Sequence, residues 1–181
     1  AGFRRTRNEL PRFAVAGLAA FDAPESIEEF RRRFDPMADL VPAHLTLVFP
    51  FPTALSALQI EAHVRRVAAG WPPIPVTFRT VRAHANEFVF LMAARGAASI
   101  VGLHDRLYTR SMAPHLRRDL PYEPHITVGR CQEPARLDEA LAAARQLLGR
   151  EFSGVMRELA LLGVARDGRI GRLSTFPLNA G

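Results

Sequence analysis

Two segments of the sequence share a pattern that is suited to acid–base chemistry. The first, HLTL, begins at His44, and the second, HITV, begins at His125, 81 residues further along the chain. Each places a threonine hydroxyl two residues after an imidazole, whose pKa of about 6.5 lets it give or take a proton near neutral pH. A pair of imidazoles, one protonated and one neutral, predicts general acid–base catalysis on an anionic group.

Both copies of this His-x-Thr pattern are predicted to begin a strand. Alternation of side chains then places His44 with Thr46, and His125 with Thr127, on one face of each strand, about 6.6 Å apart along the backbone. A single histidine in such a position is usually a satisfied polar group at a sheet edge, so either copy alone indicates little. The duplication favours one shared site that is built from both copies.

The order of apolar and polar residues predicts about seven strands and four helices. Because the strands do not alternate strictly with the helices, the chain is expected to be an α+β protein. The predicted strands are Arg12–Ala20, His44–Phe51, Ile74–Val81, Glu87–Ala93, His125–Arg130, Met156–Ala165 and Arg169–Leu178. The predicted helices are Glu25–Phe34, Ser56–Ala69, Ala98–Arg110 and Pro134–Leu148.

The predicted elements repeat along the chain. Each His-x-Thr strand follows a helix and is succeeded by a helix and then by two strands. This order indicates two related halves that face each other across a shared cleft. No low-complexity linker separates them, so residues 1–181 are expected to form one bilobal domain.

Composition limits the classes of protein to which the chain belongs. Its 181 residues are 48% apolar and 23% charged, which is typical of a folded globular chain. The single cysteine, Cys131, excludes an intrachain disulfide and a cysteine-based zinc cage and favours a reducing compartment, so we expect a cytoplasmic protein. No apolar run approaches the length that is needed to cross a membrane.

Every basic side chain that counts toward the net charge of +6 is an arginine, and lysine is absent. Schiff-base chemistry, a Walker-type phosphate loop and a lysine general base are therefore excluded. The planar guanidinium fork matches phosphate oxygens, which favours an anionic partner such as RNA or a nucleotide. The triplet Arg31–Arg33 is interpreted as a solvated helix end, and Arg117 with Arg118 as the basic pair best placed for an RNA backbone.

The contexts HLTLVF and PHITVGR resemble the paired motifs of the two-histidine (2H) phosphoesterase superfamily, and most of all its bacterial 2′-5′ RNA ligase and RNA 2′,3′-cyclic phosphodiesterase branch. The resemblance extends over the order of elements from Arg12 to Leu178. It implies two pseudo-symmetric lobes of antiparallel sheet, with helices outside and a central cleft that both motifs line.

The resemblance also implies roles for individual residues. His44 and His125 would be the catalytic pair, with Thr46 and Thr127 holding the phosphate oxygens. Arg130 stands where many members carry an arginine after the second motif. Phe49 occupies the matching place after the first motif, so the half-sites are not equivalent.

The implied activity is hydrolysis of a 2′,3′-cyclic phosphate, or reaction at a 2′-5′ phosphodiester bond, in RNA or small nucleotides. In-line displacement needs a base on one side of phosphorus and an acid on the other, and no metal or other cofactor. The resemblance favours His44 as the acid that protonates the departing 2′-oxygen and His125 as the base, although the sequence leaves this assignment open. Tyr122 is expected to stack on a base of the substrate.

Two other classes of protein remain open at this stage. One is a nucleotide- or RNA-binding module that holds its ligand without turnover, and the other is an interaction scaffold on the same fold. The two intact histidines disfavour pure binding, which needs hydrogen-bond donors but no poised acid and base. The sequence predicts a monomer with no obligate protein partner, and leaves open the substrate size, the base preference and the direction of reaction.

Overall fold

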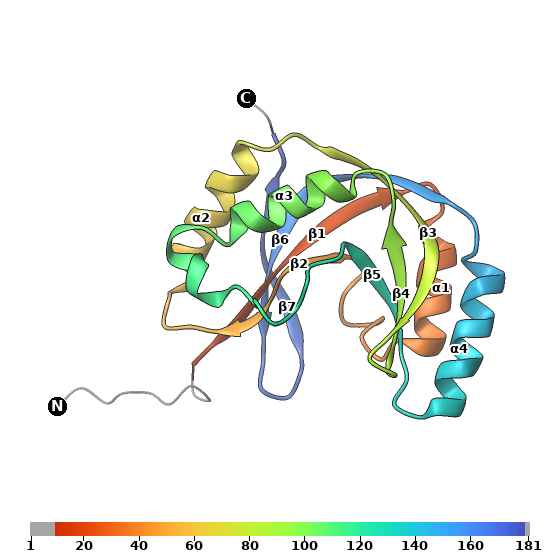
Figure 1. The fold of residues 1–181 in the computed structure, drawn as a ribbon. Coiled ribbons are helices and arrows are strands. Elements are labelled where there is room, and N and C mark those ends of the chain that lie inside the picture. The colour runs from red at the N-terminus through yellow and green to blue at the C-terminus, as the bar shows by residue number, and fades with distance from the viewer. Residues whose placement is uncertain (1–9, 180–181) are drawn as a thin grey trace.

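The structure is a computed structural model that describes residues 10–179. Figure 1 shows its helices and strands, coloured along the chain. In chain order they are β1 (Arg12–Phe21), α1 (Pro24–Phe34), β2 (Leu45–Pro52), α2 (Ala57–Ala69), β3 (Ile74–His84), β4 (Phe88–Ala93), α3 (Ala97–Leu107), a 3₁₀ segment (Arg110–His115), β5 (His125–Arg130), α4 (Pro134–Leu147), β6 (Phe152–Val164) and β7 (Ile170–Pro177).

The strands form one antiparallel sheet in the order β1-β2-β5-β4-β3-β6-β7, which confirms the predicted α+β class. An additional pairing joins β1 to β6 along almost their whole length, so six of these strands make a closed circuit. β7 lies outside the circuit and pairs with β6 alone. The link between β2 and β5 is the narrowest in the circuit, with one pair of partners, Leu45 and Ile126.

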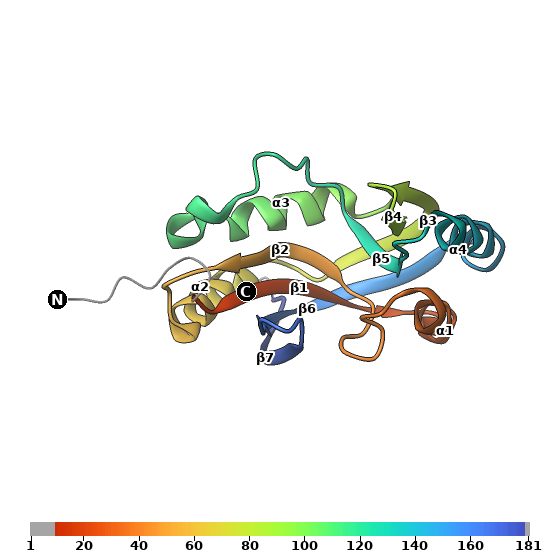
Figure 2. The same ribbon diagram turned by 90° about the horizontal axis from the view of Figure 1, so that it is seen from below.

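β6 is long enough to serve both halves of the sheet. Its first residues, Phe152–Met156, pair with β3, and its later residues, Glu158–Val164, pair with β7. One half therefore contains β3, β4 and β5, and the other contains β1, β2 and β7. Helices α1 and α4 lie against the first half, whereas α2 and α3 lie against the second (Figures 1 and 2).

The pairing of elements follows a pseudo-twofold symmetry. The series α1-β2-α2-β3-β4 is repeated as α3-β5-α4-β6-β7, as the sequence predicts. In space, α1 packs on β5 and α3 packs on β2, while β4 lies between β5 and β3 just as β1 lies between β2 and β6. β1 thus takes the place in one half that β4 takes in the other, and β7, which matches β4 in chain order, has no counterpart in its place in the sheet.

Local sequence signals account for the helix ends. Pro24 stands in the first turn of α1, where its missing N–H costs no hydrogen bond, and basic residues stand in the last turn. α2 begins with a capping box in which Ser56 and Gln59 each bond the other's backbone N–H. The helices therefore begin and end close to the predicted residues.

Several elements differ from the sequence-based prediction: β6 begins at Phe152 rather than at Met156, and α3 ends at Leu107 rather than at Arg110. β3 continues to His84 rather than ending at Val81, because Ala85 and Asn86 form a tight turn in which both have positive φ. Such a turn matches the twist of the strands that it joins. The loop predicted between Met112 and Glu123 begins within a 3₁₀ segment, whose Met112 is buried.

The main hydrophobic core draws residues from every helix and strand. A second, smaller cluster lies on the other face of β1 and β6 and is formed by Ala14, Ala16, Val41, Ala160 and Leu162. Three of its five members are alanines, which fill little volume. Small side chains on this face leave room above the sheet between the two halves. Within residues 10–179, no helix is long and apolar enough to span a membrane.

Gly154 provides a test of this architecture, because β6 at this point has β1 on one side and β3 on the other. A Cβ atom at Gly154 would lie 2.6 Å from the backbone oxygen of Ala20, which cannot move aside as a side chain can. We expect Gly154→Ala to lower the free energy of unfolding by about 1–3 kcal/mol. Thermal or urea denaturation would measure the change.

Gly171→Ala is the matched control. Gly171 lies in β7 with a negative φ, and its Cβ would meet nothing within 4 Å. Its substitution should leave the stability nearly unchanged or slightly raised, since alanine restricts the unfolded chain more than glycine does. Equal stabilities for the two variants would contradict the close packing of β1 against β6.

Candidate active site

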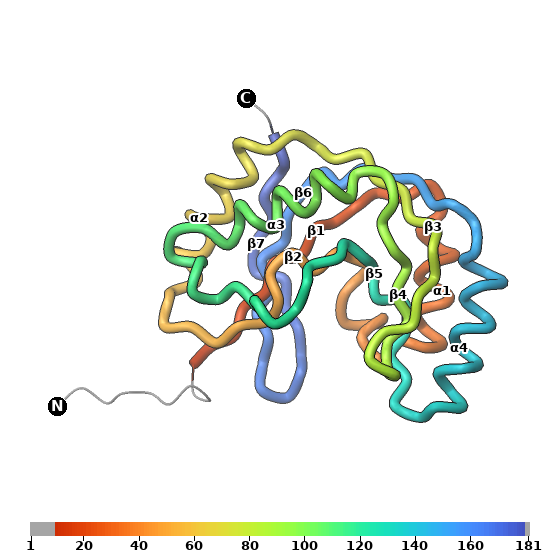
Figure 3. Tube along the Cα trace, viewed as in Figure 1, coloured from red at the N-terminus to blue at the C-terminus, as the bar shows by residue number. Residues whose placement is uncertain are grey.

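The two His-x-Thr segments meet at the centre of the sheet, where Figure 3 shows the chain of β2 beside that of β5. The paired residues Leu45 and Ile126 are fully buried in the main core. Because neighbouring side chains along a strand point to opposite faces, the residues on either side of this pair face away from that core. These four residues line one cleft: His44, Thr46, His125 and Thr127.

The cleft has a volume of about 660 Å³, which is in the range of sites for small molecules and nucleotides. Its floor is the small apolar face of β1 and β6, including Ala14, Ala16 and Leu162. Its polar groups come from both halves of the sheet. The structure thus brings the two motifs to one concave site, as the resemblance implies.

Both histidines are anchored in the same way. Nδ1 of His44 lies 2.8 Å from the carbonyl oxygen of Pro42, and Nδ1 of His125 lies 2.7 Å from that of Glu123. We assign a proton to each Nδ1, because a carbonyl oxygen can only accept a hydrogen bond. In the neutral ring Nε2 is then the proton acceptor, and each histidine offers this atom for proton transfer.

Burial lowers the pKa of both histidines below the usual value of 6.5. The hydrogen bond to the backbone carbonyl acts in the opposite sense, since it favours the charged ring. The positive charge of Arg31 lowers the pKa of His44 further, whereas the neighbouring His84 and Arg82 lower that of His125. Both rings therefore favour the neutral form at neutral pH, and an anion bound between them would raise both pKa values.

Thr46 and Thr127 occupy equivalent places beside the histidines. Thr46 pairs with Ala16 of β1, and Thr127 pairs with Phe90 of β4. Both side chains are half-buried in the cleft, and neither hydroxyl has a hydrogen-bond partner among residues 10–179. Each hydroxyl is therefore available to donate to an oxygen atom of a bound anion.

Comparison with known proteins identifies the family. A model of the 2′-5′ RNA ligase superfamily matches residues 19–168, which include both His-x-Thr segments. The chain belongs to this superfamily. The similarity to 2H phosphoesterases that the motifs indicate is thereby confirmed.

Relatives and solved structures agree with this assignment. A Geobacillus kaustophilus protein, named provisionally as a phosphoesterase, is 26% identical over 162 residues, covering 86% of this chain and 83% of its own. A crystal structure of Escherichia coli LigT with 3′-AMP covers 93% of this chain and 98% of its own, with a TM-score of 0.64 and 24% identity. The Thermus thermophilus protein TT0787 covers 94% and 98%, with a TM-score of 0.66 and 21% identity. Because the sequence identities are below 25%, these two solved structures show only that the chain shares their fold.

Behind His44 lies a buried ion-pair network, which the sequence-based interpretation missed. The prediction that the triplet Arg31–Arg33 is a solvated helix end is wrong for Arg31, which is 1% exposed. Arg32 and Arg33 are exposed, as predicted. The guanidinium of Arg31 contacts Glu28 at 2.8 Å and Asp35 at 2.9 Å.

The same network holds the segment that precedes His44. Arg31 donates to the carbonyl oxygen of Val41 at 2.9 Å, and Glu28 accepts from the backbone N–H of Ala43 at 2.5 Å. These two contacts lie on either side of Pro42, whose carbonyl oxygen anchors His44. Glu28 and Arg31 are therefore positioning residues for the first histidine.

His125 is supported by aromatic rings rather than by a buried ion pair. Its ring stacks on Phe90 with centroids 3.7 Å apart, and His84 stacks on Phe90 with centroids 4.9 Å apart. An ion pair between Arg82 and the side chain of Glu123 fixes the residue whose carbonyl anchors His125. The two histidines thus share an anchor and differ in what surrounds it.

Three residues of this second half-site escaped sequence reasoning. His84 was expected in a turn, yet it ends β3 and lines the cleft together with Phe90 and Arg82. The hydrophobic run Glu87–Ala93 predicts a strand, but it does not indicate which of its residues face the cleft. The longer β3 strand was not evident, because the turn needs positive φ at Ala85, which alanine does not signal.

Arg130, which follows the second motif, lies at the rim of the cleft. Its guanidinium is exposed, is held by Glu87 at 2.5 Å between Nε and Oε1, and lies 5.5 Å from the centre of the Phe88 ring. This ion pair offsets part of its positive charge. Arg130 can therefore reach a ligand at the rim, but it does not face the two histidines as an unpaired cation.

Tyr122 does not line the cleft, although Pro121 and Glu123 do. Its ring stacks on His104 with centroids 3.8 Å apart, and its hydroxyl is buried with no partner in the described part of the chain. Burial raises the pKa of this hydroxyl, which keeps it protonated. The expected stacking of Tyr122 on a substrate base has no support in this arrangement, and we leave it out of the site.

Among residues 10–179, no group of three or more histidine, cysteine and acidic side chains is placed to hold a metal ion. His104 has its Nδ1 at 2.9 Å from Oδ1 of Asp105 and stacks on Tyr122. The hydrogen-bond donors that line the cleft are imidazole, hydroxyl and guanidinium groups, which suit an anionic ligand; the two carboxylates that line it, Asp35 and Glu123, are paired with arginines.

The network behind His44 predicts opposite pKa changes for two variants. The positive charge of Arg31 lowers the pKa of His44 and the negative charge of Glu28 raises it. Arg31→Met should therefore raise the pKa of His44, and Glu28→Gln should lower it. NMR titration of the histidine ring protons would measure the pKa of His44 in both variants. The pKa of His125 should stay the same in each.

Arg32→Met is the matched control, since Arg32 is exposed on the same helix turn. It should leave the pKa of His44 in place. Loss of Arg31 leaves two carboxylates unpaired, which is expected to cost about 3–5 kcal/mol of stability. Glu28→Gln keeps the acceptor for Ala43 and remains informative if the other variant does not fold. A shift of the same sign in both variants would contradict the assigned network.

Proposed function

We propose that the chain is a metal-independent phosphodiesterase that acts on a 2′,3′-cyclic phosphate or a 2′-5′ phosphodiester bond of RNA or small nucleotides. The observation that carries this proposal is the shared geometry of His44 and His125. Both rings line one cleft, both donate Nδ1–H to a carbonyl oxygen two residues earlier, and both keep Nε2 for proton transfer.

The reaction follows from that geometry. Nε2 of one neutral ring takes a proton from water as the water oxygen bonds to phosphorus. The bond from phosphorus to one ribose oxygen breaks on the opposite side, and that oxygen takes the proton from Nε2 of the other, charged ring. Atoms and charge balance without a metal ion. Because the rings end with exchanged protonation states, solvent must restore them before the next turnover.

A bound phosphate favours protonation of the histidine rings, which burial disfavours. Burial lowers the pKa of both rings, so a free enzyme at neutral pH holds few protons on them. A phosphate anion between the rings favours protonation of one of them, which makes the acid when substrate is present. The hydroxyls of Thr46 and Thr127 would donate to the equatorial oxygens, where charge grows in the transition state.

Solved relatives support a nucleotide as the ligand. Crystal structures of Escherichia coli LigT contain 3′-AMP, ATP or NADP+. A cleft of about 660 Å³ has room for a ligand of nucleotide size. The resemblance places His44 as the acid and His125 as the base, and we propose this assignment for hydrolysis.

We further propose that residues 1–181 act as one bilobal, monomeric domain in the cytoplasm. The continuous core across both halves supports the single domain, and the single cysteine, which is unpaired and buried, suits a reducing compartment. A nucleotide- or RNA-binding module without turnover is the alternative. It would need the cleft and its donors, but it would not need Nε2 of both rings.

Substitution of either histidine separates these functions. His44→Ala and His125→Ala should each lower kcat for a nucleoside 2′,3′-cyclic phosphate by about 10²- to 10⁴-fold, since each removes one proton transfer. His84→Ala provides a comparison within the same cleft; His84 stacks on Phe90 and has no carbonyl anchor in the described part of the chain, so its loss should lower kcat less than the loss of His44 or His125. Nucleotide binding without turnover in the parent and in all variants would favour the binding module.

The pH dependence provides a second test. A lowered pKa keeps the base deprotonated to lower pH, so the acid limb of kcat/KM moves down. A lowered pKa also makes the acid lose its proton at a lower pH, so the alkaline limb of kcat/KM shifts to lower pH as well. We expect a bell-shaped profile centred below about pH 6.5, the ordinary histidine pKa, and unchanged by EDTA. Loss of activity on chelation would reject the metal-free mechanism.

A further inference from the structure

The floor of the cleft continues past the two motifs. On β1 the floor residues are Ala14 and Ala16, and on β6 they include Leu162 and Val164. Side chains on one face of a strand recur at every second residue. The next residue on that face of β1 is Arg12, and the chain that leaves β6 reaches Arg166 at the same spacing.

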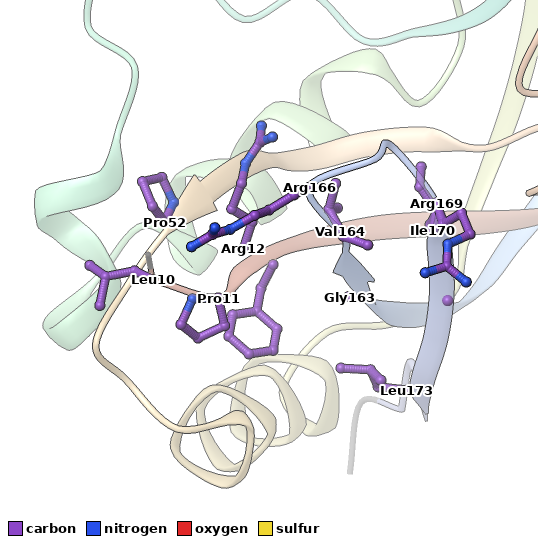
Figure 4. A pocket seen from close by; sticks show the side chains of 13 residues that line it. Leu10, Pro11, Arg12, Pro52, Gly163, Val164, Arg166, Arg169, Ile170 and Leu173 are labelled. Atoms are coloured by element: carbon purple, nitrogen blue, oxygen red, sulfur yellow. The ribbon is translucent and has the colours of Figure 1, made fainter. Parts of the chain in front are cut away.

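Figure 4 shows the groove into which this floor leads. It has a volume of about 1220 Å³, and three arginines line it: Arg12, Arg166 and Arg169. The groove and the cleft share Val164 and Ile170 as lining residues, so they adjoin. A ligand that extends out of the cleft in this direction enters the groove directly.

The groove is more basic than the cleft. No acidic residue lines it, and within residues 10–179 neither Arg12 nor Arg166 has an ion-pair partner. Arg169 is held by Asp167 at 2.6 Å. In contrast, carboxylates bind the arginines of the cleft: Arg31 with Glu28 and Asp35, Arg82 with Glu123, and Arg130 with Glu87.

The opposite exit of the cleft, beyond Arg130, is also rich in arginine, but most of these arginines are paired with carboxylates; Arg32 is the exception in the described part of the chain. Arg136 contacts Glu139 at 2.7 Å, and Arg33 approaches the same carboxyl group at 4.0 Å. Glu133 lines this surface as well. The arginine pair Arg117 and Arg118, expected to contact RNA, lines neither exit. The observations therefore favour the groove of Arg12 and Arg166 for an extended anion.

The span between the two sites sets the size of that anion. Ala16 pairs with Thr46, and Arg12 lies four residues further along β1, which corresponds to about 13 Å at 3.3 Å per residue. A ligand whose reacting phosphate lies between the two histidines can therefore place a second phosphate at Arg12 if it is longer than a single phosphate group.

We propose that Arg12 and Arg166 form a phosphate-binding subsite for the backbone of an RNA strand whose reacting phosphate lies between His44 and His125. This inference rests on the proposed function and narrows its substrate class to an oligonucleotide rather than a free nucleotide. The two exposed guanidinium groups bind phosphate oxygens through paired N–H donors. Their contribution weakens as salt rises, because each contact releases counterions from the strand.

The test compares two substrates of the same chemistry. One is cytidine 2′,3′-cyclic phosphate, and the other is a short RNA that ends in the same group. The double variant Arg12→Gln/Arg166→Gln should lower kcat/KM for the RNA about 10-fold or more, through KM, and leave the mononucleotide unchanged. The slope of log kcat/KM against log salt for the RNA should become shallower by about 1.4, as each phosphate contact on a single strand contributes about 0.7.

Two control variants remove charge elsewhere. Arg66→Gln/Arg145→Gln makes the same change in net charge on α2 and α4, at residues that line neither the cleft nor the groove. It should leave kcat/KM unchanged for both substrates. Arg32→Gln removes a cation at the opposite exit. A larger loss for RNA in the Arg32 variant than in the double variant would overturn the proposed direction. Equal losses for RNA and mononucleotide in the double variant would overturn the subsite.

Direct binding separates this inference from the proposed function. Fluorescence anisotropy with a labelled RNA that ends in a 3′-phosphate measures affinity without turnover. A parent that hydrolyses neither substrate would defeat the proposed function, while weaker RNA binding by the double variant would still support the subsite. Equal RNA binding by parent and variant, or equal affinity of the parent for an acidic peptide of the same charge, would overturn the subsite.

Discussion

The candidate site depends on a single pairing between two strands that lie far apart in the sequence. β2 and β5 join at Leu45 and Ile126, and both side chains enter the main core. Because side chains alternate between the two faces of a strand, the residues that flank Leu45 and Ile126 face the cleft. Since the pairing lies on the pseudo-twofold axis, the two histidines lie on opposite sides of that axis. In-line displacement at phosphorus requires this relationship, because the attacking and departing oxygens are also on opposite sides.

The symmetry of the backbone does not extend to the surroundings of the two rings. His44 stands in front of a buried arginine with two carboxylates, whereas His125 stands against a stack of Phe90 and His84. Burial lowers the pKa of both, yet the charges that modify each pKa come from different residues. A twofold frame with identical half-sites would give two rings of equal basicity. Different surroundings allow one ring to serve as acid and the other as base in the mechanism that we propose.

Much of this arrangement could be predicted from the sequence, because it follows from local alternation and from the repeated motif. The motif strands, the repeat of elements and the four residues on the cleft face needed no long-range information. Arg31 was misassigned because its position in a basic triplet at a helix end resembles a solvated terminus. Its spacing from Ile27 and Phe34, four and three residues, placed it on the buried face, and Glu28 and Asp35 were at the distances along a helix that permit ion pairs. Tyr122 shows the converse, since nearness to His125 in sequence gave no information on the direction of its side chain.

The departure from symmetry at β7 suits the RNA strand that we propose as the ligand. A nucleotide strand has a direction and no twofold axis, so a symmetric protein surface would offer it two equal orientations. β7 has no counterpart in its place in the sheet, and with β6 it extends one end of the cleft toward Arg12 and Arg166. At the other end most arginines, including Arg130, are paired with carboxylates. The symmetric part of the sheet thus places the two imidazoles, and the asymmetric strand gives the cleft a direction along which a polyanion can be oriented.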